Sequence, residues 1–214
     1  MDIVNRDVER YLRGLLDEDH PVAAEMEARA KEHDFPIVGR VVGMTLEVLA
    51  RAISARRVFE MGSGYGYSAY WFSRAVGESG EVHMTEGDPE NQRLALDFLG
   101  RAGFEGRVHS HVGNALDLIE ATRGELDVVF CDIDKGDYPA AWEKARDRIR
   151  IGGLWLCDNV LWSGRVAQDE PEDDVQPGWT ERIREHNEAV AADERFRSTI
   201  LPTRDGVMVA LRIA

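Results

Sequence analysis

The sequence has few cysteines, no long apolar run and no excess of basic residues. Its 214 residues include only two cysteines, Cys131 and Cys157. A disulfide-rich scaffold is therefore excluded, and we expect both to be reduced residues of the core. No apolar run approaches the ~18 residues of a membrane-spanning helix, and the first residues lack the apolar centre of a signal peptide. These absences predict a cytoplasmic protein with no membrane partner.

Acidic residues outnumber basic ones by 40 to 26, and the formal net charge is −14. Broad adhesion to nucleic acid or to an anionic membrane needs a basic surface, so this charge argues against both as general partners. A nucleic-acid substrate held by a local basic patch stays open. Candidates for such a patch are Arg40, Arg56, Arg57 and Arg165.

Two familiar nucleotide-binding patterns are missing from the glycine-rich segment 60-EMGSGYGYSA-69. No P-loop lysine follows it, and Tyr67 stands where a dinucleotide-binding G-x-G-x-x-G motif has its third glycine. The spacing is G-x-G-x-G instead, which disfavours a nucleoside triphosphate and a dehydrogenase. The segment follows a predicted strand, at the edge where open α/β sheets bind their ligands.

Patterns of strand and helix alternate from residue 57 to the C-terminus. Five predicted strands each lead into a predicted helix, which indicates a parallel sheet with helices on both faces. The last two strands are joined by Asp205-Gly206, a hairpin signal. The expected fold is α/β: a Rossmann-like, seven-stranded, mostly parallel sheet with a C-terminal antiparallel hairpin. The strands are predicted at 57–62, 81–87, 107–113, 126–132, 153–158, 195–202 and 206–213.

Amphipathic helices are predicted before the sheet begins. We expect one domain over 1–214, in which 1–56 forms N-terminal helices and 57–214 forms the sheet core. The N-terminal helices have no obvious place in the sheet and suit the interface of a homodimer. Helices are predicted at 4–18, 21–33, 44–54, 67–77, 89–102, 114–122, 138–149 and 178–193.

Carboxylates follow the first two predicted strands. Glu60 precedes the glycine turn and suits a cationic group, such as the amino group of an amino acid. Glu86 ends the second strand, where an acid can accept hydrogen bonds from ribose hydroxyls. The third strand ends in the small turn 113-GNALD-117, which can border a flat base. Amine, ribose and base together predict S-adenosylmethionine (SAM); the alternative is ordinary turns with both acids as helix caps.

Oxygen donors end the fourth and fifth predicted strands. Asp132 closes the fourth, and Asp158 and Asn159 close the fifth. Without His or Cys, this set suits Mg²⁺, Mn²⁺ or Ca²⁺ rather than zinc, and a dication would favour the ionised form of a vicinal diol. Lys135 is placed to act as a general base if its pKa is lowered. Each acid alone reads equally well as a helix cap or a surface charge, and Asp134 is either a ligand neighbour or an orienting group.

Four segments resemble the cation-dependent O-methyltransferases, the family that includes the catechol and caffeoyl-CoA O-methyltransferases. They are 60-EMGSGYGYSA-69, 85-TEGDPE-90, 132-DIDKGDY-138 and 157-CDNVLW-162. The resemblance implies that Asp132, Asp158 and Asn159 hold the metal, and that Lys135, beside Asp132, is the catalytic lysine. It also implies a SAM site and an N-terminal cofactor lid. The SAM site comprises Glu60, Gly62, Ser68, Glu86, Ala115 and Asp132; Val38 and Gly43 belong to the lid; the two turns add Ser63, Gly64, Tyr65, Gly113 and Asn114.

The acceptor side of the site is less clearly marked. Residues 162–179 form a long acidic segment framed by Trp162 and Trp179, and a tryptophan there can stack on an aromatic ring. Arg165 either pairs with an acidic substrate group or neutralises its acidic neighbours. Asp134 and Tyr138 are further candidate substrate contacts. No basic cluster for a coenzyme A tail is evident, which disfavours a caffeoyl-CoA substrate.

The sequence therefore predicts an O-methyltransferase that depends on SAM and a divalent metal. Its acceptor is expected to be a hydroxyl of a catechol-like small molecule. A tRNA 5-hydroxyuridine O-methyltransferase of the same family is the alternative, which the acidic charge disfavours. A noncatalytic SAM-binding domain would be expected to lose the metal acids or the glycine turn, and both are present.

Overall fold

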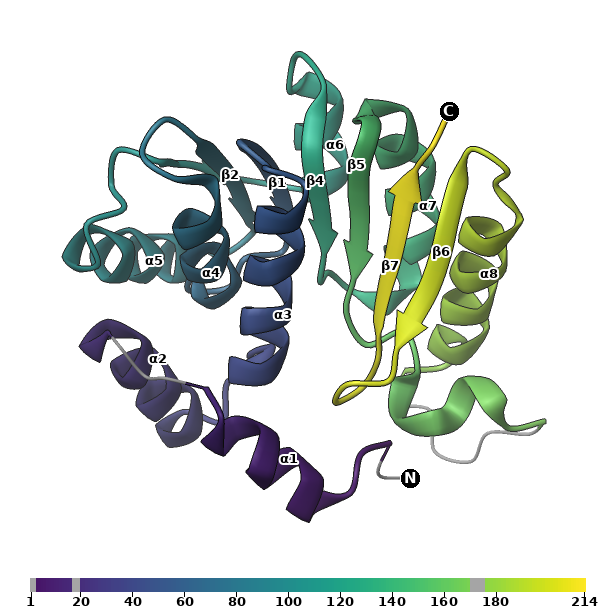
Figure 1. Ribbon diagram of the computed structural model, residues 1–214, viewed down its shortest axis with the longest axis horizontal. Coiled ribbons are helices and arrows are strands. Elements are labelled where there is room, and N and C mark those ends of the chain that lie inside the picture. Colours follow the sequence, from purple (N-terminus) through teal and green to yellow (C-terminus); the bar gives the residue numbers. More distant parts are fainter. Residues whose placement is uncertain (1–2, 17–19, 170–175) are drawn as a thin grey trace.

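A seven-stranded sheet forms the centre of the computed structural model, which describes residues 3–16, 20–169 and 176–214. The strands lie in the order β3-β2-β1-β4-β5-β7-β6, which Figure 1 shows from β2 to β6. Strands β1 to β5 pair in parallel, and β7 runs antiparallel to both β5 and β6. The predicted mixed sheet with its C-terminal hairpin is confirmed. The strands are β1 (Arg57–Met61), β2 (Glu81–Glu86), β3 (Val108–Val112), β4 (Leu126–Cys131), β5 (Ile149–Cys157), β6 (Phe196–Leu201) and β7 (Val207–Arg212).

Helices cover both faces of the sheet. One cluster of buried side chains joins α2 to α5 with the sheet, and a second joins α6 to α8 with its other face. The helices are α1 (Arg6–Gly14), α2 (Pro21–Glu32), α3 (Gly39–Ala52), α4 (Tyr67–Val76), α5 (Pro89–Arg101), α6 (Ala115–Ala121), α7 (Tyr138–Ala145) and α8 (Trp179–Ala192), with the short 3₁₀ helices η1 (Lys135–Asp137), η2 (Arg146–Arg148) and η3 (Trp162–Ala167).

Six of the seven strands lie within one residue of their predicted bounds, and β5 is the exception. It begins at Ile149, inside the predicted helix 138–149, because Ile149 pairs with Leu126 of β4 and is buried. Gly152 then takes a φ of +77° where the register shifts. This glycine hides the start of the strand from a reading of the local pattern.

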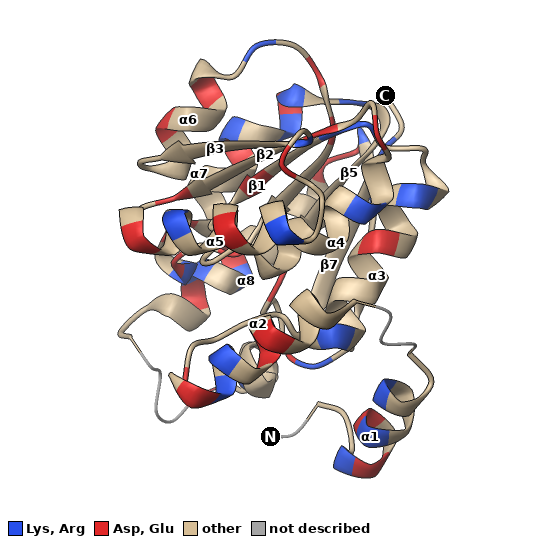
Figure 2. Cartoon of the chain, turned by 90° about the vertical axis from the view of Figure 1, so that its left-hand side faces the viewer, with Lys and Arg blue, Asp and Glu red and all other residues tan. Residues whose placement is uncertain are grey.

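The predicted N-terminal helices also have corrected bounds. Helix α3 begins at Gly39, five residues before the predicted start at 44. The helix predicted at 4–18 is seen as α1, and its last predicted residues, 17–18, lie outside the described part of the chain. Figure 2 shows α1 set apart from the sheet, with acidic and basic positions alternating along its ribbon. None of the helices in the described segments is both long and apolar enough to cross a membrane.

The strand registers align the ends of β1, β4 and β5. Met61 pairs with Cys131, and Cys131 pairs with Cys157. The residues that follow these strands therefore lie in one row at the carboxyl edge of the sheet. Both cysteines are buried in the core, as the sequence predicted. Asp132 and Asp158 come directly after them, on the opposite side of the strand pleat.

Candidate functional site

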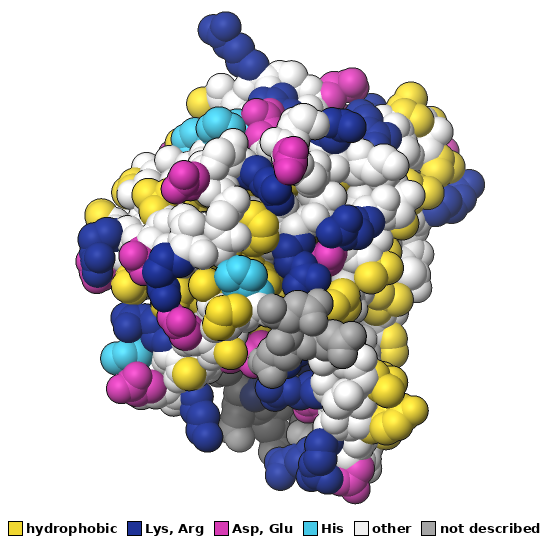
Figure 3. Space-filling view, turned by 60° about the vertical axis from the view of Figure 1, so that its left-hand side comes forward, with side chains coloured by type: hydrophobic (Ala, Val, Ile, Leu, Met, Phe, Trp, Pro, Cys, Tyr) yellow, Lys and Arg dark blue, Asp and Glu magenta, His cyan; other side chains and the backbone are white. Residues whose placement is uncertain are grey.

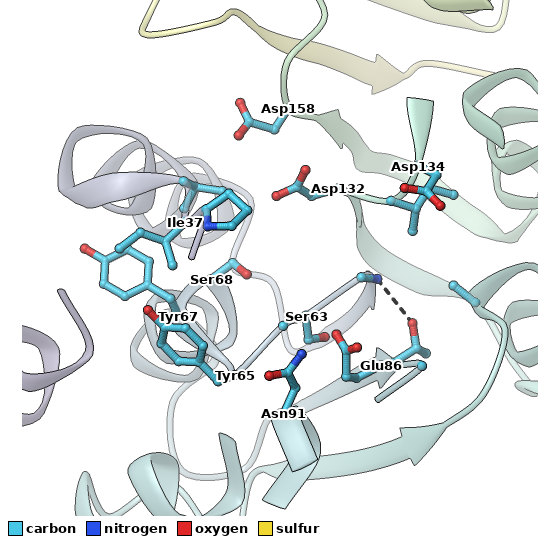
Figure 4. Close-up of a pocket in the computed structure, with 18 of the residues that line it drawn as sticks. Ile37, Ser63, Tyr65, Tyr67, Ser68, Glu86, Asn91, Asp132, Asp134 and Asp158 are labelled. Carbon is cyan, nitrogen blue, oxygen red and sulfur yellow. Dashed lines mark hydrogen bonds between the residues drawn. The ribbon is translucent and has the colours of Figure 1, made fainter. Parts of the chain in front are cut away.

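A cavity of about 500 Å³ opens at the carboxyl edge of the parallel strands. This volume is within the range of roughly 300–1,000 Å³ that is usual for small-molecule sites. Figure 4 shows Asp132 and Asp158 on one side of the cavity, and Ser63, Tyr65 and Glu86 on the other. Most of the predicted site residues line it: Val38, Gly62, Ser63, Gly64, Tyr65, Ser68, Glu86, Gly113, Ala115, Asp132, Asp134, Lys135, Asp158 and Asn159.

The glycine turn after β1 is held tightly against the end of β4. Gly62 has a φ of +80°, and a Cβ atom there would lie 2.4 Å from the backbone oxygen of Asp132. The Asp132 amide donates to the Met61 oxygen at 2.9 Å, and the Ser63 amide donates to the Thr85 oxygen at 2.9 Å. The turn therefore needs glycine, and the backbone forms the floor of the cavity.

Glu60 lies beneath this turn and is fully buried. Neither of its carboxylate oxygens has a well-formed hydrogen bond within the described residues. Burial raises the pKa of Glu60 to about 7; the hydroxyls of Ser63 and Ser68 oppose the rise, and the carboxylates of Asp132 and Glu86 add to it. A cationic ligand above Ser63 and Ser68 would stabilise the ionised form of this carboxylate.

Asp132, Asp158 and Asn159 form the opposite corner of the cavity. Asp158 is buried, and its Oδ1 atom has no hydrogen-bond partner among the described residues. Burial and the nearby Asp132 carboxylate raise the pKa of Asp158 to about 7. Asn159 has a φ of +57°, a conformation that asparagine tolerates better than most residues.

This corner fits the ligand preference of a hard divalent cation. In the described segments no group of three His, Cys, Asp or Glu side chains is arranged to hold a metal, but the third donor expected here is an amide, Asn159. Two carboxylates, one with an unpartnered buried oxygen, and an amide are oxygen donors of the kind that Mg²⁺ binds. The donor set therefore fits the predicted metal.

Lys135 lies beside Asp132, but its pKa is shifted in the direction opposite to the one a general base needs. Its Nζ atom is 3.1 Å from Asp132 Oδ1 and 3.2 Å from the Ile133 oxygen. Burial lowers the pKa of Lys135, but the charge and hydrogen bond of Asp132 outweigh it, and the pKa is raised above its usual value. Lys135 is therefore a charged group in this state.

A family model described as O-methyltransferase matches residues 17–213. The chain belongs to this O-methyltransferase family. A caffeoyl-CoA O-methyltransferase of Petroselinum crispum is 32% identical over 180 residues, which cover 80% of this chain and 75% of that protein. The expected enzyme class, a SAM-dependent O-methyltransferase, is confirmed by this membership.

Solved structures of other O-methyltransferases share the fold over nearly the whole chain. TomG from Streptomyces achromogenes, solved in complex with SAM, gives a TM-score of 0.86 at 28% identity and covers 97% of this chain and 96% of that one. An O-methyltransferase from Bacillus cereus in complex with SAH gives a TM-score of 0.84 at 26% identity and covers 96% and 97%. The sequence motifs therefore identified the correct family.

Three predicted cofactor residues of this O-methyltransferase do not line the cavity. Glu60 lies under its floor. Asn114 caps α6, since its side chain accepts a hydrogen bond from the Leu116 amide at 2.8 Å. Gly43 lies in α3 against Trp71, and a Cβ atom there would be 2.2 Å from the indole nitrogen. The absence of a side chain at Gly43 permits close packing of α3 on α4, and Gly43 takes no part in the cavity wall.

Three of the four predicted substrate contacts also lie away from the cavity. Tyr138 is fully buried, and its hydroxyl donates to the Asp158 backbone oxygen at 2.8 Å. It therefore supports the end of β5 at Asp158 from below, and its side chain does not reach the cavity. Trp162 contacts Trp179, with ring centroids 5.8 Å apart, and the Arg165 guanidinium lies 5.7 Å from the Trp162 ring. Asp134 alone lines the cavity.

Several cavity residues of the O-methyltransferase were missed by sequence reasoning. The segment 35–37 reaches the cavity from the connection between α2 and α3, Asn91 from the first turn of α5, and Arg204 from the turn between β6 and β7. Only Asn91 could have been predicted as a cavity residue from its place in the sequence, because it follows the strand-end acid Glu86 closely. The other positions depend on tertiary contacts.

Proposed function

We propose that this O-methyltransferase uses SAM and a divalent cation to methylate one hydroxyl of a catechol-like small molecule. The observation that carries the proposal is that one cavity joins the glycine turn to the corner of oxygen donors. The turn side suits a cofactor, and the corner side suits a chelated diol. The donor and the acceptor would meet between them.

The residues at the glycine-turn end of the cavity have the chemistry that SAM binding needs. Glu86 lines the cavity at the end of β2, where it can accept hydrogen bonds from ribose hydroxyls. Glu60 favours a cationic amino group from beneath Ser63 and Ser68. Bound SAM would supply the methyl group, which passes from its sulfonium sulfur to the acceptor oxygen as that oxygen loses its proton. The enzyme's own task is alignment of the two reactants.

The metal would be held by Asp132, Asp158 and Asn159. A bound cation would favour the ionised form of the acceptor hydroxyl. Tyr138 would keep the end of β5 in place through its hydrogen bond to the Asp158 backbone. Mg²⁺ is the expected ion, with Mn²⁺ or Ca²⁺ as substitutes.

Lys135 is the residue that we assign to the acceptor proton. Its charged form would stabilise an ionised hydroxyl directly. It would act as the base only when Asp132 is engaged elsewhere, because the charge of Asp132 and the hydrogen bond that Lys135 donates to it raise the pKa of Lys135. Both roles need Lys135 close to the acceptor, and its position in the cavity wall beside Asp132 supports this assignment.

The test is transfer of labelled methyl from SAM to a 3,4-dihydroxy aromatic, with Mg²⁺ and then with EDTA. Methylation that EDTA abolishes would support the proposal. Undermodified tRNA runs in parallel as the competing acceptor, and labelling of tRNA alone would refute the small-molecule acceptor. Transfer that is insensitive to EDTA would refute the metal.

The tRNA alternative has little support from the surface charge. Of the four arginines expected to form a basic patch, Arg57 begins β1 at the opposite edge of the sheet and pairs with Glu81, and Arg40 pairs with Glu27. On the face shown in Figure 3, Lys and Arg side chains are interspersed with acidic ones. The catechol-like acceptor is therefore the one that we retain.

We also propose that the enzyme works in the cytoplasm as a homodimer. Helix α1 exposes Val8 and Tyr11, and Leu15 directly after it is exposed as well. An apolar surface of this kind favours burial against a partner. Light scattering of the natural protein and of a Tyr11→Glu, Leu15→Glu variant tests the assembly. A monomer at working concentration in the natural protein would refute the homodimer.

A further inference from the structure

Arg204 lies where two cavities meet. It lines the 500 Å³ cavity and also a second cavity of about 390 Å³ that is bounded by α1, α2 and the start of α3. The segment 35–37 borders both cavities as well, so the two adjoin. The second cavity has no part in the proposed cofactor and metal sites, and no role has been assigned to Arg204 so far.

The backbone of Arg204 is held in an unfavourable conformation. Its φ is +51°, in the left-handed region that carries an energetic cost for a residue with a Cβ atom. Residues that keep such a conformation are concentrated at functional sites. Glycine would avoid the cost, so the arginine side chain at this position calls for a reason.

The guanidinium of Arg204 has one fixed contact and spare hydrogen-bonding capacity. Its Nη1 atom donates to the Ile37 oxygen at 2.6 Å, which ties the β6–β7 turn to the segment over the cavity. No carboxylate in the described segments forms an ion pair with it. A guanidinium has five N–H donors.

The second cavity carries a surplus of positive charge. Among the residues that the structure describes, four basic ones line it, Arg13, Lys31, Arg40 and Arg204, against two acids, Glu9 and Glu27. Glu27 is neutralised by Arg40, which donates to its two carboxylate oxygens at 3.0 and 2.7 Å. The surplus occurs in a chain with a formal net charge of −14. A local field of this sign attracts anions.

We propose that Arg204 selects acceptors that carry an anionic substituent, and that this substituent binds at the junction of the two cavities. The inference rests on the proposed function, because the hydroxyl to be methylated must lie at the Asp132 and Asp158 corner. A carboxylate is the simplest such group, and a guanidinium can bind it through two parallel hydrogen bonds. The acceptor class is then a dihydroxy aromatic acid.

The test compares kcat/KM for 3,4-dihydroxybenzoate with kcat/KM for its methyl ester, which presents the same diol without the charge. In the natural protein the acid should be the better acceptor. In Arg204→Gly, which relieves the backbone conformation, the ratio of acid to ester should fall about 10-fold or more, as expected for loss of a charged hydrogen bond. Arg204→Lys keeps the charge and should retain part of the ratio.

Arg165→Ala is the matched control, since Arg165 stacks on Trp162 and lines neither cavity. The acid-to-ester ratio of this variant should equal that of the natural protein. Thermal melts of all variants, with SAM binding measured by calorimetry, show whether each is folded and loaded with cofactor.

Three results would overturn the inference. If kcat/KM of Arg204→Gly equals that of the natural protein for both acceptors, Arg204 does not bind the anionic substituent. An equal loss for both acceptors would assign it only to holding the segment 35–37 through the Ile37 oxygen. If the natural protein binds SAM but methylates neither acceptor, the proposed acceptor class is wrong and the inference fails with it. Loss of SAM binding itself would instead refute the cofactor assignment.

Discussion

Replacement of Glu60 by Gln should stabilise the protein in the absence of ligands, and only above acidic pH. The carboxyl is fully buried beneath the glycine turn without a well-formed hydrogen bond among the described residues. Burial raises its pKa from 4.5 to about 7. Gln resembles the protonated acid in shape and has no charge to bury. The change therefore removes a cost that the natural protein carries only when Glu60 is ionised.

The direction of the stability change and its pH range follow from the pKa of Glu60, which is 4.5 in the unfolded chain and about 7 in the folded one. Below pH 4.5 the carboxyl is protonated in both the folded and the unfolded chain, so it contributes no pH dependence. Between pH 4.5 and 7 only the folded state keeps the proton, so stability falls as the pH rises. Above pH 7 the loss is complete. At about 1.4 kcal/mol for each pH unit of this interval, the loss is about 3 kcal/mol.

Urea denaturation in EDTA at pH 4 and pH 8 measures this difference. Glu60→Gln should match the natural protein at pH 4 and exceed its free energy of unfolding by about 3 kcal/mol at pH 8. Glu86→Gln is the matched control, because Glu86 lines the same cavity and is only half-buried. A Glu60→Gln variant with the same pH dependence as the natural protein would refute the reasoning. The stabilised variant should also bind SAM more weakly.

Four further substitutions, one of them a control, test buried charge and close packing in the protein. Asp158→Asn should raise stability in EDTA at pH 8, because the pKa of Asp158 is about 7, and should abolish Mg²⁺-supported methyl transfer. Burial lowers the pKa of His186 to about 4, so stability measured by urea should fall from pH 6.5 to 4, and less steeply in His186→Gln. Gly43→Ala, with its Cβ atom 2.2 Å from Trp71, should cost about 1–3 kcal/mol. Gly14→Ala, with open space around it, should not destabilise the fold.

The sheet was predictable because each strand carries its own pattern. Apolar runs such as 126–131 end abruptly in polar turns, and strands separated by helices leave few possible arrangements. The start of β5 was missed because Gly152 interrupts the run with a left-handed backbone. The start of α3 was missed because Gly39 reads as a breaker when it is the first helical residue. In both cases tertiary packing outweighed the local signal.

The site was predictable where it follows strand ends. Asp132 and Asp158 come directly after buried strands, and parallel pairing brings such positions together at one edge. Distance along the sequence concealed the rest. Arg204 reaches the site only because the β6–β7 turn folds back to the Ile37 oxygen, 167 residues away. Tyr138 lies among the predicted motifs, but its side chain points into the core, which the motif alone does not reveal.

The two ends of the cavity share one electrostatic feature. Glu60 beneath the turn and Asp158 at the metal corner are both buried carboxyls whose pKa is raised to about 7 by burial. Neither gains enough from its neighbours to offset that burial, even though Lys135 and Arg204 act in the opposite direction at Asp158. Residues that reduce the stability of the ligand-free fold are commonly retained where function needs them. A cationic ligand at each end would remove the cost, which is the charge that the proposed amine-bearing cofactor would bring to one end and the proposed metal ion to the other.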